Sequence, residues 1–515
     1  MDTKALRQKI LDLAIRGKLV PQDPNDEPAS VLLERIRAEK QQMVKEGKLK
    51  AKDIKNDTII YVGEDNLHYE KFQDGSVKCI DFEPDYEIPD NWAWCNLGLL
   101  FNHNTGKALN SSNSTGKALT YITTSNVYWN RFELGNLKTM PFADSEIEKC
   151  TVKKGDLLVC EGGDIGRAAI WNYDDEIRIQ NHLHRLRAYD SVQTLFYYYV
   201  LYLYKFEEKI NGKGIGLQGL SSSALHNIIV PVPPIAEQKS IVMSLENMIS
   251  IIDTIESDQY KLTSCINNAK AKILDLAIRG KLVPQDLNDE PASVLLERIR
   301  AEKEELIKQG KIKRDKKESI IFRGDDNSYY DVLPQNWSVT TLGSITDPLL
   351  LNDGDWILSE NMSSDGDVLL VQLGSIGQMK YINKGFKHLT EQTFQDLGCT
   401  QIYPGFMLIN RIVSDKLCAC ILPQIDGKLI TTVDTCWVAP KEEWYNLKYL
   451  MYAIASPAYQ QLVMSKSSGT TRKRISKANL INLALPFPPL KEQQRIVKAI
   501  EHAFILLDLV TESLS

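Results

Sequence analysis

Long hydrophobic runs are absent from the 515-residue chain, so no segment has the roughly 20 apolar residues that cross a bilayer as a helix. The first residues, Met1 to Arg7, also lack the apolar core of a secretory signal peptide. The nine cysteines are odd in number, and Cys418-Ala419-Cys420 lacks the spacing of a metal finger. We therefore predict a cytoplasmic protein with reduced thiols and no structural metal.

An excess of basic charge is missing as well. Lys and Arg number 61 against 67 Asp and Glu, which gives a net charge of −6. A protein that coats nucleic acid is normally basic, so any DNA binding must depend on local basic patches or on phosphate contacts from partner subunits. The hydrophobic fraction of 43% and the charged fraction of 25% are ordinary for a globular protein, and the length suggests about three domain-sized units.

The motifs of catalysis are missing too. Residues 106–108 and 116–118 carry Gly-Lys-Ala without the leading glycine and the hydroxyl residue of a phosphate loop, and the glycines of 212–216 follow no strand. An adenine methyltransferase would need an Asn/Asp-Pro-Pro-aromatic turn, which the sequence lacks. Glu207-Glu208-Lys209 has no further carboxylates placed around it for metal-assisted hydrolysis. We predict a non-enzymatic chain without catalytic, cofactor-binding or metal-ligating residues.

Two internal repeats organise what is present. Residues 9–40 and 272–303 agree at 31 of 32 positions, and the Pro-x-Pro-Pro-x-x-Glu-Gln segment of 231–238 recurs at 486–493. The stretches between them differ from each other, although both open with a Pro-x-Asn-Trp motif. The predicted order is N-terminal scaffold helices (1–50), a first variable domain (88–230), central scaffold helices (231–317), a second variable domain (333–485) and a C-terminal scaffold helix (486–515).

Each variable domain mixes β-rich runs with helical ones. Strands are predicted after Gly155 and Gly405, and helices over 194–210 and 445–463, so each domain is expected to be α/β. The lysine-rich segments 48–55 and 311–317 are typical of solvated connectors.

A heptad seam runs through the central scaffold. We predict one long helix that starts after Pro233-Pro234 and stops before Gly280. The same pattern continues in the C-terminal and N-terminal segments, which favours an intramolecular antiparallel coiled coil over ordinary packing on a globular core. The seam positions are Ile241, Leu245, Met248, Ile252, Ile255, Leu262, Ile266, Ala269, Ile273 and Leu276; then Ile496, Ile500, Ala503, Leu507, Val510 and Leu514; and Leu6, Ile10 and Leu13.

The two repeats have different offsets, and this predicts how the chain closes. Ser515 corresponds to Tyr260 and Met1 to Ser264, so the C-terminal helix followed by the N-terminal helix should imitate the central helix. The predicted fold class is therefore α+β, with two α/β domains on a long antiparallel helical scaffold in a pseudo-twofold circular repeat. The chain termini should nearly meet.

The junctions resemble those of specificity subunits of type I restriction–modification systems. The resemblance rests on residues 216–238 and 475–493, on Asn91-Trp92, and on 154–158 and 163–167; residues 403–411 match the family pattern only loosely. It implies two target-recognition domains, each reading half of a bipartite DNA target, and helices that space the halves and bind methyltransferase subunits. S-adenosylmethionine would belong to the methyltransferase partner, and restriction subunits are further candidate partners. No membrane partner is expected.

The candidate DNA contacts are basic residues and one histidine. They lie in the sequence among Asn, Ser and Thr residues, which can also bind bases or phosphates. The first domain offers Lys107, Lys117, Arg131, Arg167, Arg178, His182 and Arg185, and the basic loop of 467–474 in the second offers Arg472, Lys473 and Arg474. Alternation predicts that His182 and His184 share one face of a strand. An exposed, merely solvated loop is the alternative for 467–474.

Two questions stay open at the level of sequence. A coiled-coil adaptor that displays two protein-binding domains is an alternative function, which the acidic net charge favours slightly. The near-identity of the long repeat extends to apparently solvent-facing Lys, Arg and Glu. It indicates either two equivalent docking sites, and hence two methyltransferase subunits per chain, or a recent duplication.

Overall fold

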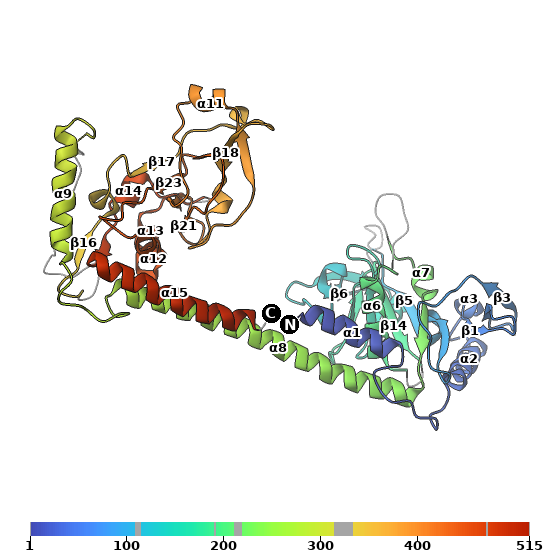
Figure 1. Ribbon diagram of the computed structural model, residues 1–515. Coiled ribbons are helices and arrows are strands. Elements are labelled where there is room, and N and C mark those ends of the chain that lie inside the picture. The colour runs from blue at the N-terminus through green and yellow to red at the C-terminus, as the bar shows by residue number, and fades with distance from the viewer. Residues whose placement is uncertain are drawn as a thin grey trace. The chain divides into compact units, whose positions relative to one another are not determined.

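The computed structural model describes residues 2–108, 115–189, 192–210, 219–313, 333–469 and 472–513 (Figure 1). The chain divides into two units, Met1–Asp258 and Gln259–Ser515. The boundary lies inside the longest helix, α8 (Ile235–Ile278), so each unit contains one half of it. Within the described part of the chain, no helix is long and apolar enough to cross a membrane.

Helix α8 has the predicted limits, because it begins directly after Pro233-Pro234 and ends before Gly280, whose φ is +67°. In the first unit, α1 (Thr3–Ile15) lies antiparallel to the first half of α8, with Arg7 2.6 Å from Asp253. In the second unit, α15 (Leu490–Glu512) lies antiparallel to the second half, with Asp508 next to Lys270 (Figure 1). The predicted antiparallel helix pairs are therefore present within each unit.

Most of the predicted seam is confirmed, and three positions, Leu6, Met248 and Val510, are wrong because their side chains are exposed. Ile241, Leu245, Ile252, Ile266, Ile496 and Ile500 are buried. Met248 is exposed because the adjacent Ile249 packs against the core instead. Val510 is exposed because it lies beyond Phe504, the last residue of α15 in the apolar cluster of the second unit. The predicted seam position Leu514 lies outside the described residues.

The second helix of each long repeat is also bounded by a proline and a glycine. Helices α2 (Ala29–Lys45) and α9 (Ala292–Lys308) follow Pro28 and Pro291, and they stop before Gly47 and Gly310 in the left-handed backbone region. The connector predicted at 48–55 is partly wrong. Residues Ala51–Ile54 form the short helix α3, and the Ile54 side chain is buried under the sheet that follows.

The first unit contains three larger sheets, in the orders β15-β4-β1-β2-β3, β12-β11-β14-β5 and β10-β13-β6-β9. Their strands are β1 (Ile59–Val62), β2 (His68–Lys71), β3 (Val77–Ile80), β4 (Ala93–Asn96), β5 (Phe101–Thr105), β6 (Lys117–Ile122), β9 (Lys138–Phe142), β10 (Thr151–Val152), β11 (Leu157–Cys160), β12 (Ala168–Ile170), β13 (Ile177–Ile179), β14 (Leu183–Ala188) and β15 (Ile229–Val232). The remaining elements are α4 (Leu97–Leu100), the 3-10 helix Thr124–Asn126, the hairpin β7 (Val127–Tyr128) and β8 (Arg131–Phe132), α5 (Asp144–Cys150), α6 (Thr194–Phe206) and α7 (Ser222–His226).

The second unit has sheets in the orders β17-β23-β20-β21, β19-β18-β22 and β16-β24. Their strands are β16 (Ser338–Thr340), β17 (Leu351–Asp353), β18 (Val368–Val371), β19 (Phe386–Leu389), β20 (Met407–Asn410), β21 (Cys418–Ile421), β22 (Lys428–Thr431), β23 (Thr435–Val438) and β24 (Leu485–Phe487). The remaining elements are α10 (Leu342–Ile345), the 3-10 helices Ser359–Asn361 and Leu373–Ser375, α11 (Glu391–Asp396), α12 (Leu447–Ala455), α13 (Pro457–Lys466) and α14 (Lys477–Ile481).

The two variable domains share a plan, and the α/β prediction is confirmed for both. Each has an antiparallel sheet built around β11 or β20 and a second sheet with one parallel strand pair, β6·β13 or β18·β22. Helix α6 stops at Phe206, short of the predicted end. The predicted helix at 445–463 is two helices, because the Ser456-Pro457 step ends α12 and starts α13.

Candidate nucleic-acid interface and its supports

The repeated Pro-Pro-x-x-Glu-Gln motif joins each variable domain to the scaffold. In the first unit, the Trp92 indole N–H donates to Glu237 over 2.8 Å, and Gln22 donates to the other oxygen of the same carboxylate. In the second unit, Trp337 and Gln285 donate to Glu492 over 3.0 and 2.6 Å. Burial raises the pKa of Glu237 and Glu492, and these hydrogen bonds oppose the rise.

The glutamine of the motif fastens the start of each scaffold helix. The Gln238 amide accepts from the backbone N–H of Gln193 over 3.0 Å and donates to the Pro233 carbonyl over 2.8 Å. Gln493 makes the same two bonds, with Asn446 and Pro488, over 2.9 and 3.0 Å. Since both residues are fully buried, these bonds satisfy polar groups that water cannot reach. The motif is therefore a structural joint, made the same way twice.

Backbone hydrogen bonds show which positions of the two domains correspond. The Glu161 N–H donates to the His182 carbonyl over 2.9 Å, and the Leu220 N–H donates to the Glu161 carbonyl over 2.7 Å. In the second domain, Arg411 donates to Asp434 over 2.8 Å and Ile475 donates to Arg411 over 3.0 Å. Positions 161, 182 and 220 thus match 411, 434 and 475, and the residues directly before the last pair, Gly219 and Arg474, match as well. The strand-end positions are 161, 182 and 219 in the first domain and 411, 434 and 474 in the second. We call each set of three positions the strand-end site of its domain.

In the first domain, the strand-end site holds an exposed histidine beside a carboxylate. The His182 ring lies 3.3 Å from Glu161, and its side chain is 56% exposed. The prediction that His182 and His184 share a strand face is wrong, because β14 begins at Leu183 and His182 lies in the turn before it. His184 is buried and lies within hydrogen-bond distance of the Leu220 carbonyl (2.8 Å) and His103 (3.0 Å). Burial lowers the pKa of His184, and that of His103 to about 3, so both are neutral.

Two of the predicted contact residues in the first domain have buried side chains with partners inside the fold. Lys107 donates to Glu146 and to the Pro141 carbonyl, each over 2.7 Å. Arg185 donates to the Thr151 carbonyl over 2.9 Å and to the Asn102 side chain over 3.0 Å.

The other predicted residues of the first domain reach the surface to different degrees. Arg131 and Arg167 meet at the Tyr128 ring, with guanidinium carbons 4.7 and 5.0 Å from its centre. Arg131 is 65% exposed, whereas Arg178 is 17% exposed beside a glutamate. Lys117 is exposed at the start of β6. Of the contact residues predicted in the first domain, Arg131 and Arg167 are therefore the two that the structure places side by side, at Tyr128.

The basic loop of the second domain is held at its base. Arg474 and Ser468 exchange two backbone hydrogen bonds, of 2.8 and 3.0 Å, and the Lys473 carbonyl accepts from Val413. The Arg474 guanidinium lies 2.8 Å from the Asp434 carboxylate, while Arg472 and Lys473 are exposed. Residues 470–471, in the middle of the loop, lie outside the described residues.

A buried ion pair lies next to this loop. Arg411 is 4% exposed, lies 3.3 Å from Asp353 and donates to the Val433 carbonyl. Burial raises the pKa of Asp353, and the charge of Arg411 opposes the rise. Sequence reasoning did not select Arg411, Asp434 or Asp353. The sequence did contain a sign that this segment is unusual. Residues 403–411 match the family pattern only loosely, and Arg411 is the last residue of that segment.

A family model described as "Type I restriction modification DNA specificity domain" matches residues 89–263 and 334–514. The chain belongs to this family. The specificity subunit is 26% identical over 98% of its length to the type I restriction enzyme EcoEI specificity subunit of Escherichia coli, covering 89% of that protein. It is 29% identical over 66% of its length to the EcoAI specificity subunit of the same species, covering 62% of that protein. These matches favour the specificity-subunit interpretation over the adaptor alternative.

Structural comparison agrees on the fold. A solved chain from work on "complex assembly and conformational transition of the type I R-M system" superposes with a TM-score of 0.53 at 15% identity. The match covers 83% of the specificity subunit and 94% of that chain.

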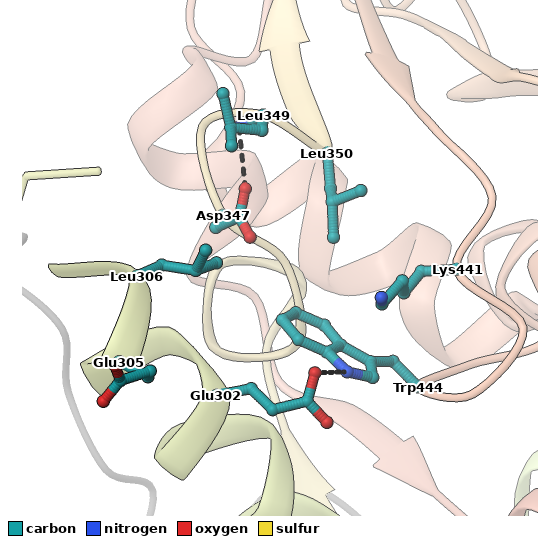
Figure 2. A pocket seen from close by; sticks show the side chains of 8 residues that line it. All are labelled: Glu302, Glu305, Leu306, Asp347, Leu349, Leu350, Lys441 and Trp444. Carbon is teal, nitrogen blue, oxygen red and sulfur yellow. Dashed lines mark hydrogen bonds between the residues drawn. The ribbon is translucent and has the colours of Figure 1, made fainter. Parts of the chain in front are cut away.

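One cavity of the second unit is lined by no residue of the basic loop. It measures about 360 Å³ and lies between α9 and the second domain (Figure 2). Figure 2 shows the Glu302 carboxylate accepting from the Trp444 indole N–H, over 3.1 Å. Glu305 and Asp347 also line the cavity, whereas Lys441 is its one basic lining residue. This acidic wall suits no phosphate backbone, and the described residues contain no group of three or more His, Cys, Asp or Glu that could hold a metal.

Proposed function

We propose that this chain recognises a split DNA target, with the domain of 88–230 reading one half and the domain of 333–485 reading the other. One observation supports this most strongly: two domains of the same plan are attached by the same Trp–Glu–Gln joint but present different side chains at matching surface positions. An asymmetric target of two unlike half-sites requires two such readers on one frame. At 1.5 Å per residue, the seam from Ile241 to Leu276 limits the spacing of the half-sites to about 53 Å.

In this proposal the chain itself is not an enzyme. S-adenosylmethionine binds to methyltransferase partners, and methylation and cleavage are activities of the assembled complex. All nine cysteines are free thiols, which agrees with a protein that works in the reducing cytoplasm. Methyl transfer or cleavage by the isolated chain would contradict this part of the proposal.

Two methyltransferase subunits should dock on one chain. Several repeated charges have partners inside their own unit, as in the pairs Arg35–Glu27 and Arg298–Glu290, so the fold explains part of the identity between repeats. The fold does not explain Val31 and Val294, which are 47% and 45% exposed at the same place on α2 and α9. An apolar residue kept exposed at both positions supports a shared docking surface. Restriction subunits would join the same assembly.

Two experiments test the proposal. Filter binding of random duplex DNA, with and without the methyltransferase partner, should show binding that the partner strengthens. Mapping of methylated adenines in the host genome should return one bipartite sequence. A saturated complex with one methyltransferase per chain would contradict the docking proposal, and a continuous or palindromic target would contradict the two-reader proposal.

A further inference from the structure

The two strand-end sites share a backbone but not their chemistry. Glu161, His182 and Gly219 occupy the first, and Arg411, Asp434 and Arg474 occupy the second, behind the same backbone hydrogen bonds. The same backbone hydrogen bonds maintain the geometry of both sites. The side chain of Arg411 is buried and belongs to the fold, whereas His182 in the first site and Arg474 in the second are exposed and can differ without loss of the frame. Two domains that bind different DNA sequences should differ at positions where their backbones match and their side chains carry different charges.

Arg474 is positioned for contact with a base edge. Its side chain is 41% exposed and lies 2.8 Å from the Asp434 carboxylate, which is itself 26% exposed. An ion pair this exposed contributes little to stability, so its effect on orientation matters more. The contact with Asp434 is made by Nη2, while the Nε atom of Arg474 is buried without a hydrogen-bond partner among the described residues, so the exposed part of the guanidinium is its Nη end.

Backbone hydrogen bonds support Arg474 from below. Its backbone exchanges two hydrogen bonds with Ser468, and the Asp434 carbonyl accepts from the backbone of the buried Arg411. Arg472 and Lys473, immediately beside it, are exposed and can meet phosphates on either side of a contacted base. A guanidinium that contacts a carboxylate through one hydrogen of Nη2 retains the N–H groups of Nη1 and the second N–H of Nη2. A parallel pair of such groups is the pattern that pairs with O6 and N7 of guanine in the major groove.

We propose that Arg474, oriented by Asp434, is a specificity-determining residue that reads a guanine in the second half-site. The inference rests on the proposed function and deepens it. At the matching place the first domain has a glycine instead of the arginine and presents Glu161 and His182. Since a carboxylate accepts from the cytosine amino group, the first half-site should not require guanine at the corresponding position.

The test uses the full chain with its methyltransferase partner and a DNA library randomised at both half-sites. Arg474→Lys keeps the charge but loses the planar fork, and Asp434→Asn keeps the shape but releases the guanidinium. Each should lower the preference for guanine at one position of the second half-site by roughly 5- to 100-fold, with the first half-site unchanged. The matched control is Arg472→Lys with Lys473→Arg, which keeps both charges and should change no base preference.

The outcomes separate the hypotheses. If Arg474→Lys weakens binding equally on all sequences, Arg474 is a phosphate contact and the inference fails. An unaltered base preference in both variants also overturns it. Should Asp434→Asn lose the whole second half-site through misfolding, the more conservative Arg474→Lys decides, and unchanged reading of the first half-site shows that the complex is intact. If the wild-type chain selects no bipartite sequence, the proposed function itself fails.

Discussion

The two recognition domains have the same frame and opposite charges at matching positions. Lys107 follows Gly106 where the chain crosses from one sheet to the next, and Asp355 follows Gly354 at the equivalent crossing. The inversion recurs at Glu161 and Arg411. A Cβ on Gly106 or Gly354 would lie 2.1 or 2.3 Å from a backbone oxygen, so the fold fixes both glycines, whereas the charged residues that follow them, Lys107 and Asp355, differ in sign.

The two joints between domain and scaffold, in contrast, have the same side chains in both units. Glu237 and Glu492 accept from the same pair of residue types in both units, with nearly the same geometry. A joint must place any recognition domain correctly on the scaffold, whatever that domain reads. Repetition therefore marks the parts that assemble the molecule, and divergence on a constant backbone marks the parts that discriminate between sequences.

Exchanging a whole domain should give the largest effect. Replacement of residues 88–230 by the corresponding domain of another specificity subunit, with the joint kept, should abolish recognition of the original first half-site. The second half-site should be unaffected. The loss for the original target should reach roughly 10³-fold or more, since specific binding exceeds non-specific binding by at least that factor. Methylation mapping of both half-sites measures it, and a change in both would show that the domains do not read independently.

Neutralising the basic loop should have the next largest effect. Replacing Arg472, Lys473 and Arg474 by glutamine should weaken binding to all DNA. It should also lower the slope of log affinity against log salt by up to about three charge units, because fewer counterions are released. Salt titrations of random duplex binding provide the measurement.

The matched control for the loop is in the first domain, where the same replacement at Lys117, Arg131 and Arg167 tests whether basic residues contribute equally there. An unchanged slope in the loop variant would remove the loop from the interface. Equal slopes in both variants would indicate that the two domains hold phosphates to the same extent.

The matching glycines Gly98 and Gly343 differ in how much space surrounds them in the cores of the two units. A Cβ on Gly98 would lie 2.1 Å from the His226 ring, which is 3.0 Å from the buried Asp57 and is therefore not free to move. The matching Gly343 faces Ile481, with the nearest atom at 3.3 Å. Gly98→Ala should destabilise the first unit by about 1–3 kcal/mol, and Gly343→Ala should cost less than about 1 kcal/mol. Denaturant unfolding of the two variants measures the difference.

The control for this comparison is the pair Gly106→Ala and Gly354→Ala. Both meet backbone oxygens, at 2.1 and 2.3 Å, so both should be strongly destabilising. If Gly98→Ala proved as mild as Gly343→Ala, the ring and its aspartate would be more adaptable than their burial indicates.

The sequence predicted the repeating parts of the fold well. Prolines and glycines set the ends of α2, α8 and α9, because these residues act on the backbone locally. The three strands of residues 59–80 were missed. These segments are only four residues long, and β2 and β3 alternate polar with apolar residues too weakly to stand out. Of the three, β1 pairs with the more distant β4, β2 pairs with β1, and β3 pairs with β2, so their strand structure depends on these pairings.

The candidate site was harder to predict, because residue type does not reveal burial. Lys107 and Arg185 were chosen for their charge, yet their side chains are paired inside the domain. Asp434 was passed over because an acidic residue does not suggest DNA binding. Its relation to Arg474 depends on backbone contacts across 40 residues of sequence, which no local pattern contains.

The buried carboxyl groups of Glu237 and Glu492 at the two joints predict a small effect of pH on the stability of the fold. Burial raises the pKa of Glu237 and Glu492 in the folded state above the unfolded value. The folded protein therefore binds these protons more tightly, and the cost of the buried charges disappears as pH falls through the raised pKa. The stability of the wild type relative to Glu237→Gln should rise as pH is lowered from neutral to below the raised pKa. Thermal unfolding of the pair across that range checks the sign, and Glu492→Gln should behave alike if the joints are equivalent.

The smallest effect on DNA binding is expected from a circularly permuted chain, in which the N- and C-termini are joined. By sequence offset, the C-terminal and N-terminal helices together match the central helix, and only positions 261–263 lack a counterpart. Four helical steps separate the matched positions, so the ends should lie about 6 Å apart in an ideal helix and about twice that after fraying. A chain with its termini joined by a short linker, and reopened between 313 and 333, should therefore keep both half-sites and its affinity. Spin labels at Thr3 and Glu512, after removal of the exposed Cys79 and Cys265, give the separation directly. A separation of tens of ångströms would show that the two units repeat in sequence without closing into a circular arrangement, and the permuted chain should then lose its target.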